Sequence, residues 1–287
     1  MRDLFGVIVM QKGSLYLIAT PIGNLLDIGF RAVEVLKTVD VIAAEDTRHS
    51  KTLLQHYQID TKMISMHAHN EELRVGQLLA WLQDGQSVAV ISDAGTPLIS
   101  DPGFPLVRAA REAGVQVVPV PGACAAIVAL CASGLPADKF VFEGFLSAKS
   151  GARQKRLTEL QDEARTVVFY ESPHRIMAML ADMMTVLGGG RKVVIGRELT
   201  KQYETIHEDT IEGMLAWMTA DPNQQRGEFV VMLAGARVDD NAKQTQSLRM
   251  LKVLLAELPL KQAVRLCAEL SGAKKNELYE IALQWQS

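Results

Sequence analysis

The order of apolar and polar residues predicts alternating strands and helices through the first half of the chain. Short, continuous apolar runs predict buried strands at 15–19, 39–44, 62–66, 88–92 and 115–120. Between them, apolar residues recur at helical spacing in 31–37, 47–55, 71–83 and 104–112. Strands that alternate with helices in this way form a mostly parallel sheet with right-handed crossovers. We therefore predict an α/β domain over residues 14–135.

The same texture continues beyond the turn-rich segment 133–138, which predicts a domain junction. Strands are expected at 140–145, 166–170, 193–196 and 229–234, an edge strand at 203–207, and helices at 157–162 and 175–186. A polar linker is expected at 239–246, followed by helices at 248–258, 260–270 and 276–285, a helix-turn-helix pattern. We thus predict a second α/β domain over 136–236 and a small helical domain over 245–287.

Composition narrows the class of protein. Hydrophobic residues make up 48% of the 287 positions and charged residues 22%, which predicts folded domains rather than a disordered chain. No apolar run reaches the ~20 residues needed to cross a bilayer, so we expect no membrane partner. Cys124, Cys131 and Cys267 are odd in number and favour reduced thiols in a cytoplasmic protein. Residues 1–9 are expected to be a dispensable extension.

Polar loops follow most of the predicted strands, where parallel sheets bind ligands. They occupy 20–27, 45–48, 92–103, 121–123, 171–175 and 197–201. Neither a P-loop nor a dinucleotide-type glycine motif is present, and no zinc-binding motif is found, so no metal is expected. Carboxylates and backbone groups in these loops suit a ligand with amine, ribose hydroxyl and adenine groups.

Each loop taken alone has a structural alternative. Asp93 could close an Asx-turn, and the Pro121-Gly122 pair could form an ordinary turn. Glu45 and Asp46 precede a helix, where carboxylates are favourable without any ligand. The single loops therefore do not decide between a binding site and local structure.

Basic residues mark a candidate nucleic-acid surface, although a run of charge is more often a solvated face. A run of four lies in 149–156, three more lie in neighbouring loops and two precede the last helix; these residues are Lys149, Arg153, Lys155, Arg156, Arg48, Arg175, Lys201, Lys274 and Lys275. Lysine and arginine are the residues that contact RNA phosphates.

The loop motifs together resemble those of the ribosomal RNA small subunit methyltransferase I family, within the tetrapyrrole-methylase-like class of S-adenosylmethionine transferases. The motifs are ATPIGNL at 19–25, AEDTR at 44–48, HAHNE at 67–71, SDAGTPLISDPG at 92–103, PG at 121–122, FYESPHR at 169–175 and RELTK at 197–201. The resemblance covers residues 14–287. The first motif departs from the glycine-rich loop of the wider class, which argues against a corrinoid or porphyrin substrate.

This resemblance implies two α/β domains of the tetrapyrrole methylase type with S-adenosylmethionine in the cleft between them, a C-terminal helical domain and a homodimer. It implies methyl transfer to the ribose 2′-oxygen of a cytidine in the decoding region of 16S rRNA, in the small ribosomal subunit. By analogy, the cofactor contacts are placed on Asp93, Ala94, Gly95, Pro97, Ile99, Pro121, Gly122, Ala123, Ala125, Tyr170 and Phe229.

A ribose hydroxyl is a weak nucleophile, so a proton acceptor could assist the reaction. Glu171 is our first choice because it ends a strand that faces the expected cleft, and Asp46 is the second. Two other functions stay open. The chain could methylate a tetrapyrrole, which a methylation assay offering both substrates would decide, or bind RNA without catalysis, which calorimetry with S-adenosylmethionine would decide.

Overall fold

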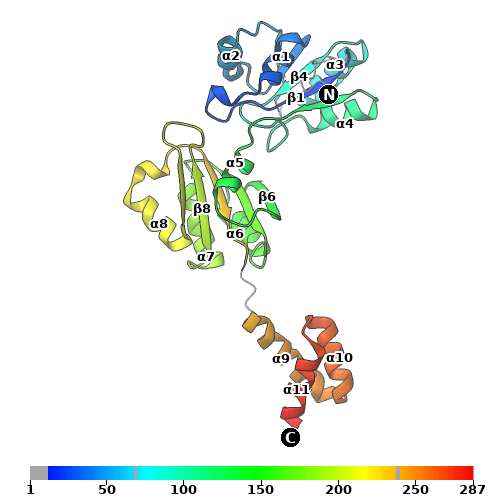
Figure 1. The fold of residues 1–287 in the computed structure, drawn as a ribbon, viewed down its shortest axis with the longest axis vertical. Helices are drawn as coiled ribbons and strands as arrows, with labels where there is room; N and C mark the ends of the chain where they lie inside the picture. The colour runs from blue at the N-terminus through cyan, green and yellow to red at the C-terminus, as the bar shows by residue number, and fades with distance from the viewer. Residues whose placement is uncertain (1–11, 68–69, 237–239, 287) are drawn as a thin grey trace, which may run out of the picture. The chain divides into compact units, whose positions relative to one another are not determined.

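The computed structural model describes residues 12–67, 70–236 and 240–286. Residue contacts divide the chain into two compact units, and the boundary in the sequence lies between Ala234 and Gly235 (Figure 1). Two predictions fall outside the described residues: the extension expected at 1–9, and Ala68 and His69 of the motif HAHNE at 67–71. No described helix is long and apolar enough to cross a membrane.

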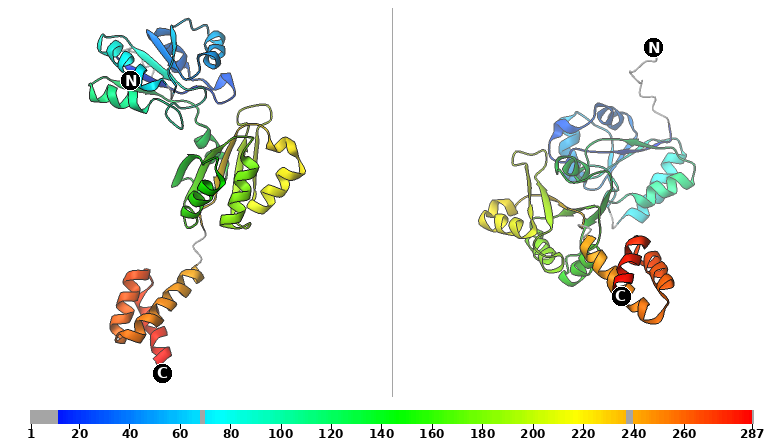
Figure 2. Two further views of the ribbon diagram at one scale, coloured as in Figure 1. Left: turned by 180° about the vertical axis from the view of Figure 1, so that it is seen from behind. Right: turned by 60° about the horizontal axis from the view of Figure 1, so that its bottom comes forward.

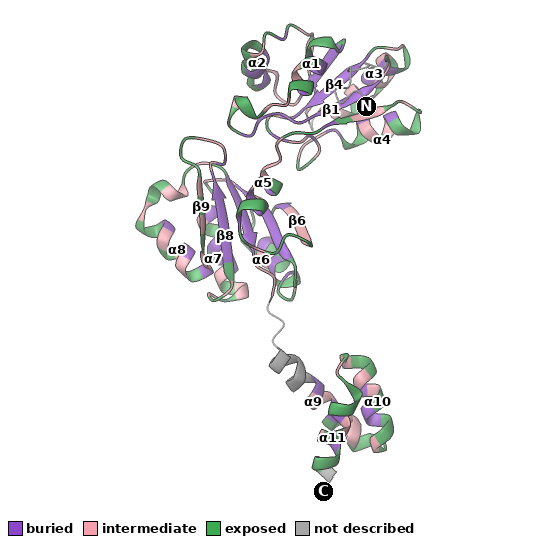
Figure 3. Ribbon diagram, in the orientation of Figure 1, coloured by how far each residue is buried: buried purple, intermediate pink, exposed green. Residues whose placement is uncertain are grey.

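The first sheet of the larger unit was predicted to be mostly parallel, and all of its strand pairs are parallel. It contains β1 (Leu15–Ile18), β2 (Val41–Ala44), β3 (Met63–Ser65), β4 (Val88–Ile91) and β5 (Val117–Val120). Their order is β3-β2-β4-β1-β5. β2 and β4 are buried at every position, which explains their continuous apolar sequences. Figure 3 shows this burial for β4.

Helices cover both faces of this sheet. They are α1 (Phe30–Thr38), α2 (Thr47–His56), α3 (Glu71–Gln83) and α4 (Phe104–Glu112). Ile42 packs in one cluster with Leu36 of α1 and Leu54 of α2, whereas the next strand residue, Ala43, packs in another with α3 and α4. Successive strand residues point to opposite faces, so the two helix pairs form separate layers.

The second sheet is mixed. It contains β6 (Phe140–Phe145), β7 (Thr166–Glu171), β8 (Lys192–Arg197), β9 (Thr205–Thr210) and β10 (Phe229–Leu233), in the order β6-β7-β10-β8-β9. β10 is antiparallel to both of its neighbours. Phe229, at the start of β10, is therefore paired with Glu171 and with Arg197, at the carboxyl ends of β7 and β8.

Different helices cover the two faces of the second sheet (Figures 1 and 2). One face carries α6 (Ser150–Glu159), α7 (Ile176–Leu187) and α8 (Ile211–Ala220); the other carries α5 (Ala125–Ala132). Ile22, from the loop after β1, packs with α5 against this second sheet. We did not predict α5 and α8, because short, mainly apolar helices lack the periodicity that identifies an amphipathic one.

The smaller unit contains α9 (Asp240–Glu257), α10 (Leu260–Ser271) and α11 (Lys275–Gln286). Leu251, Val264, Cys267 and Leu278 form its core. Gly272 ends α10 in the left-handed conformation, which glycine adopts without strain. The predicted linker at 239–246 is wrong from Asp240 onward, since α9 begins there; lysine and glutamine, which this segment contains, are good helix formers. Asp239 lies outside the described residues.

Arg153 corrects one prediction of an RNA contact. Its side chain is only 3% exposed, and its Nε donates to Oδ2 of Asp182 at 2.6 Å. Burial alone would raise the pKa of Asp182, but hydrogen bonds from Gln154, Ser150 and Arg153 together hold it below its ordinary value. Arg153 therefore joins α6 to α7 inside the protein, and its charge is not available to RNA.

We predict that Arg153→Ala destabilises the larger unit by about 3–5 kcal/mol, because it leaves the Asp182 carboxylate buried without its cation. Urea denaturation measures this loss. Lys155→Ala, an exposed position in the same helix, is the control and should change stability by less than about 0.5 kcal/mol. Equal effects of the two substitutions would contradict the structural role of Arg153.

Candidate functional site

Two loops at the carboxyl edge of the first sheet are joined by their backbones. The Thr20 amide donates to the Gly95 carbonyl at 2.9 Å, and the Gly95 amide donates to the Thr20 carbonyl at 3.1 Å. The Thr20 hydroxyl also donates to the Ser92 carbonyl. The loop after β1 and the loop after β4 are thereby held in a fixed relation.

The loop after β4 has an unusual backbone. Gly95 and Gly103 have positive φ angles, and so do Leu98 and Ser100, at 71° and 72°. A residue with a side chain pays about 1–3 kcal/mol for such a conformation, and such residues cluster at ligand-binding sites. The surrounding structure imposes this loop shape against the local preference of its sequence.

A pocket of about 440 Å³ lies between this loop and the second sheet. It is lined by residues of both sheets: Ile22, Glu45, Asp93, Ala94, Gly95, Thr96, Ile99, Ser100, Asp101, Ala125, Phe145, Tyr170, Glu171, Ser172, Pro173, Gly196, Leu199, Glu228, Phe229 and Val230. The volume is within the range of about 300–1,000 Å³ that is typical of small-molecule sites.

The lining of this pocket is acidic, and no lysine, arginine or histidine belongs to it. Burial, and then the charge of Glu45, raise the pKa of Asp101 to about 6. Burial, and then the charge of Asp93, raise the pKa of Glu45. Crowded carboxylates of this kind favour a cationic ligand, because a positive charge relieves their mutual repulsion. No group of three or more ligands that could hold a metal occurs in the described residues.

Aromatic side chains complete the pocket. The Tyr170 ring contacts the rings of Phe142 and Phe145, with centroids 5.0 and 5.6 Å apart. The Tyr170 hydroxyl accepts a hydrogen bond from the Ala126 amide at the start of α5. Burial raises the pKa of Tyr170, which therefore stays neutral. The pocket thus has an acidic side and an apolar, aromatic side.

The structure brings most of the predicted cofactor residues into this lining, namely Asp93, Ala94, Gly95, Ile99, Ala125, Tyr170 and Phe229. Four others, Pro97, Pro121, Gly122 and Ala123, do not line it. A Cβ on Gly122 would come within 2.9 Å of the Ala19 Cβ, so this glycine permits close packing of two loops. The Ala123 carbonyl accepts a hydrogen bond from the Thr96 hydroxyl.

The two predicted proton acceptors are both engaged in local contacts. Glu171 accepts from the Ser172 amide at 2.7 Å and pairs with Arg175 at 2.9 Å, and its side chain is fully buried. Asp46 caps the start of α2 by accepting from the Arg48 amide. Hydrogen bonds from the Arg48 side chain and amide lower the pKa of Asp46 to about 2. Asp46 is therefore a very weak base.

The predicted RNA contacts divide into paired and free cations. Five of them pair with a carboxylate at the surface or near it: Arg48, Arg156, Arg175, Lys201 and Lys274. Lys149, Lys155 and Lys275 are exposed and form no ion pair with any described residue. Lys274 and Lys275 belong to the smaller unit.

Asp101, Glu228 and Phe145 line the pocket but were not among our predicted site residues. Asp101 lies within the motif at 92–103, and its carboxyl group was the feature that could have identified it as a site residue. Glu228 precedes β10, and Phe145 ends the parallel edge strand β6. The rule that ligands bind where parallel strands end cannot identify Glu228, because β10 runs in the opposite direction.

Known proteins share this organisation over almost the whole chain. Residues 14–214 match the tetrapyrrole (corrin/porphyrin) methylase family, and residues 241–286 match the RsmI C-terminal HTH domain. A ribosomal RNA small subunit methyltransferase I from Escherichia coli O157:H7 is 53% identical over 276 residues, 96% of each chain. The protein of that name from Pseudomonas aeruginosa is 53% identical over 279 residues, 96% of this chain and 99% of the relative.

The chain belongs to the ribosomal RNA small subunit methyltransferase I family. Solved structures of more distant proteins share the fold of this family member. The methyltransferase CobJ is 18% identical, covers 78% of this chain and 95% of its own, and has a TM-score of 0.58. Uroporphyrin-III C-methyl transferase from Thermus thermophilus, complexed with S-adenyl homocysteine, is 19% identical over 77% of this chain and 97% of its own, with a TM-score of 0.52.

The raised pKa of Asp101 predicts a pH-dependent effect on the stability of this family member. Between pH values of about 4 and about 6 the unfolded chain ionises this carboxyl group while the folded protein keeps it protonated, so folding loses stability as pH rises. We expect Asp101→Asn to raise the melting temperature at pH 7.5 by about 2–4 °C, the shift that corresponds to about 1 kcal/mol in a domain of this size.

The gain should shrink as the pH falls through about 4 and vanish below about 3, where Asp101 is protonated in both states. Thermal scans across this pH range measure it. Asp60→Asn, at an exposed position outside the pocket, controls for the loss of one negative charge. A gain that is independent of pH would show that ionisation of Asp101 is not its cause.

Proposed function

We propose that the 440 Å³ pocket holds S-adenosylmethionine. The chemistry of the lining fits this group: carboxylates of Glu45, Asp93 and Asp101 complement its positive charges, and Tyr170 and Phe229 offer apolar surface to its adenine. Ala94 and Gly95 lie at the pocket wall, and their small side chains allow a ligand to approach the loop closely. When bound, this cofactor supplies an electrophilic methyl group without the help of a metal.

We propose that the methyl group goes to the ribose 2′-oxygen of a cytidine in the decoding region of 16S rRNA. The observation that carries this proposal is 53% identity over 96% of the chain to a protein named ribosomal RNA small subunit methyltransferase I. The match of residues 241–286 to the HTH domain of the same family supports it, as does the TPIGN loop at 20–24. Tetrapyrrole enzymes share the fold at under 20% identity, which carries no argument about the substrate.

Asp101 is our proposal for the proton acceptor, in place of Glu171 and Asp46. A general base works best when its pKa is near the working pH, and the pKa of Asp101 is about 6. Asp46, with a pKa of about 2, holds a proton too weakly. Both carboxylate oxygens of Glu171 already accept hydrogen bonds from Ser172 and Arg175. Glu171 is therefore a positioning residue that orients the loop 172–175.

For RNA binding, we propose phosphate contacts from Lys149 and Lys155, because they are exposed and form no ion pair with any described residue. Lys275 and Lys274 are proposed as contacts from the smaller unit. Arg48, Arg156, Arg175 and Lys201 remain proposed contacts that would have to exchange a carboxylate for a phosphate. That exchange costs least at Arg48, whose ion pair is exposed, and most at Arg175, whose partner Glu171 is fully buried.

We propose a homodimer that works in the cytoplasm, where the small ribosomal subunit is its substrate. Leu26 and Phe30 support a protein interface, since they are 81% and 95% exposed and lie close together in the sequence. The domain limits 14–135, 136–236 and 245–287 are also kept as proposals. Light scattering on the purified chain measures the number of subunits.

Deletion of the gene should abolish one ribose methylation in the decoding region of 16S rRNA, and the intact gene should restore it. Mapping of 2′-O-methyl groups on rRNA from both strains measures this. In vitro, the purified protein should methylate small subunits and leave a precorrin-type substrate unmodified. Methylation of the precorrin alone, or binding of subunits without any methyl transfer, would refute the proposed function.

The double variant Lys149→Ala/Lys155→Ala should weaken RNA binding, and more strongly at low salt. Each lysine that contacts a phosphate contributes about 1 to the slope of log affinity against log salt concentration. Filter binding at several salt concentrations measures this slope. Lys37→Ala/Arg111→Ala removes the same charge from exposed positions elsewhere. An identical slope for both double variants would exclude Lys149 and Lys155 as phosphate contacts.

Asp101→Asn should lower kcat by about 100-fold, which is the lower end of the range expected when a general base is lost. Glu171→Gln should leave kcat of the folded enzyme unchanged while lowering its melting temperature, because Arg175 loses its charged partner. Single-turnover methylation at saturating cofactor measures both rates. If Glu171→Gln lowers the methylation rate and Asp101→Asn leaves it unchanged, Glu171 rather than Asp101 is the proton acceptor.

A further inference from the structure

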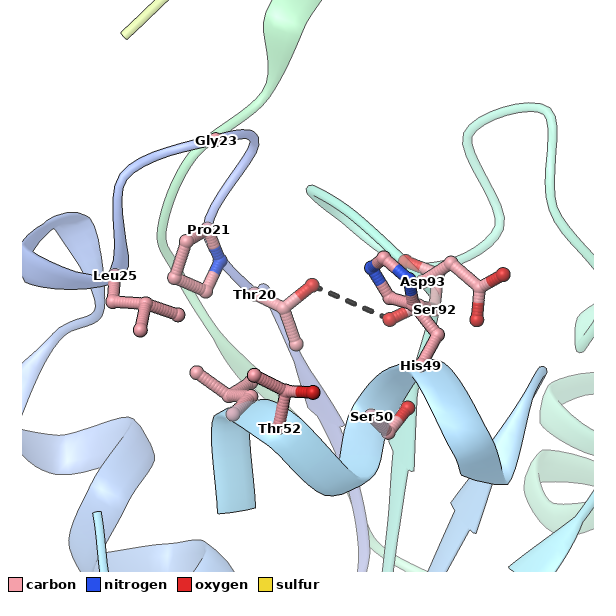
Figure 4. A pocket seen from close by; sticks show the side chains of 10 residues that line it. Thr20, Pro21, Gly23, Leu25, His49, Ser50, Thr52, Ser92 and Asp93 are labelled. Atoms are coloured by element: carbon pink, nitrogen blue, oxygen red, sulfur yellow. Dashed lines mark hydrogen bonds between the residues drawn. The ribbon is translucent and has the colours of Figure 1, made fainter. Parts of the chain in front are cut away.

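A second cavity, of about 300 Å³, shares Asp93 with the proposed cofactor pocket. Figure 4 shows this smaller cavity and the side chains that line it. Three segments line it: the loop after β1, helix α2 and the start of the loop after β4. The lining residues are Thr20, Pro21, Gly23, Leu25, His49, Ser50, Thr52, Leu53, Ser92 and Asp93. The proposed cofactor site does not use this cavity.

The two cavities share one side chain, that of Asp93. Asp93 is fixed in place because its Oδ1 accepts a hydrogen bond from the Asp46 amide at 3.0 Å. The Thr20–Gly95 backbone bridge joins a loop that lines the smaller cavity to a loop that lines the larger one. Ligands in the two cavities would therefore both contact Asp93, the wall that the cavities share.

Ser50 carries a second, independent sign of a ligand. The residue is 3% exposed and lines the smaller cavity, and Figure 4 shows its hydroxyl on the cavity side of α2. Its Oγ has no hydrogen-bond partner among the described residues. Leaving a buried hydroxyl unpaired costs about 1–3 kcal/mol, so a polar group of a ligand would satisfy it at a gain.

The chemistry of the walls selects the class of ligand. Pro21, Leu25 and Leu53 provide apolar surface, and Ser50 and Thr52 provide hydroxyl groups. His49 and Asp93 are the ionisable residues in the lining, and no lysine or arginine lines the cavity to neutralise a phosphate group. A neutral, flat ring with polar edges fits these walls, and a pyrimidine base is such a ring.

We propose that this cavity receives the base of the acceptor nucleotide, unstacked from the RNA, so that its ribose lies at the Asp93 wall beside the cofactor pocket. This inference rests on the proposed function and adds the acceptor site to it. Enzymes that modify a nucleotide commonly extract it from its stack in this way, and hydrogen bonds to the edge of the base then help to select it.

The test uses the full-length protein saturated with S-adenosylhomocysteine and probes it with cytidine 5′-monophosphate. Methyl resonances of Leu25 and Leu53 report on the cavity, because both side chains line it. We expect cytidine 5′-monophosphate to shift them and ribose 5-phosphate, which lacks the base, to leave them unchanged. Ser50→Ala should weaken cytidine 5′-monophosphate binding by about fivefold, the loss expected for one hydrogen bond.

Thr52→Trp should fill the cavity from an exposed position of α2, with no loss of stability. We expect it to abolish the cytidine 5′-monophosphate shifts. It should also lower kcat/KM for small subunits by at least about tenfold, because only binding of the acceptor RNA is impaired. Its affinity for S-adenosylhomocysteine should be unchanged. Gln55→Trp, an exposed position of α2 outside the cavity, is the matched control and should behave as the unmodified protein.

The outcomes separate this inference from the proposed function. If the enzyme methylates small subunits while cytidine 5′-monophosphate shifts neither leucine and Thr52→Trp turns over normally, the acceptor site is wrong and the function stands. Weaker S-adenosylhomocysteine binding by Thr52→Trp would assign the cavity to the cofactor and also overturn the inference. Base-dependent shifts in an enzyme that does not methylate rRNA would support the cavity and refute the function.

Discussion

The backbone pair between Thr20 and Gly95 determines the geometry of the whole site. Neighbouring strands β1 and β4 end at the same edge of a parallel sheet, and the two amides exchange hydrogen bonds of 2.9 and 3.1 Å just beyond that edge. The bond is made by main-chain atoms, and it relies on glycine at position 95, where φ is positive. The acidic pocket and the smaller cavity lie on the two sides of this junction.

Much of the first sheet was predictable from sequence, because each of its strands is a short apolar run followed by a polar loop. The position of the loop 92–103 on the pocket followed from the same rule. The partners of that loop in the second sheet were harder to predict. Phe229 reaches the pocket only because β10 is antiparallel to β7 and β8, and strand direction is not visible in a short apolar run.

Single side chains were predicted less well than loops, and charge shows why. The run 149–156 has four positive residues in the sequence, but α6 turns Arg153 inward to Asp182 and Arg156 toward Glu143 and Glu159. Whether a cation is free depends on carboxylates that are distant in sequence. Asp46 shows the same limit in reverse, since its low pKa arises from Arg48, which the sequence alone presented only as a possible RNA contact.

The crowding of Glu45, Asp93 and Asp101 has a consequence for turnover. A wall of carboxylates attracts a sulfonium cation, and this attraction is strong where solvent is partly excluded. Methyl transfer leaves a neutral thioether in the same place, and the attraction to the sulfur then disappears. The acidic wall that favours binding of the proposed cofactor would therefore also favour departure of its spent form, which limits product inhibition.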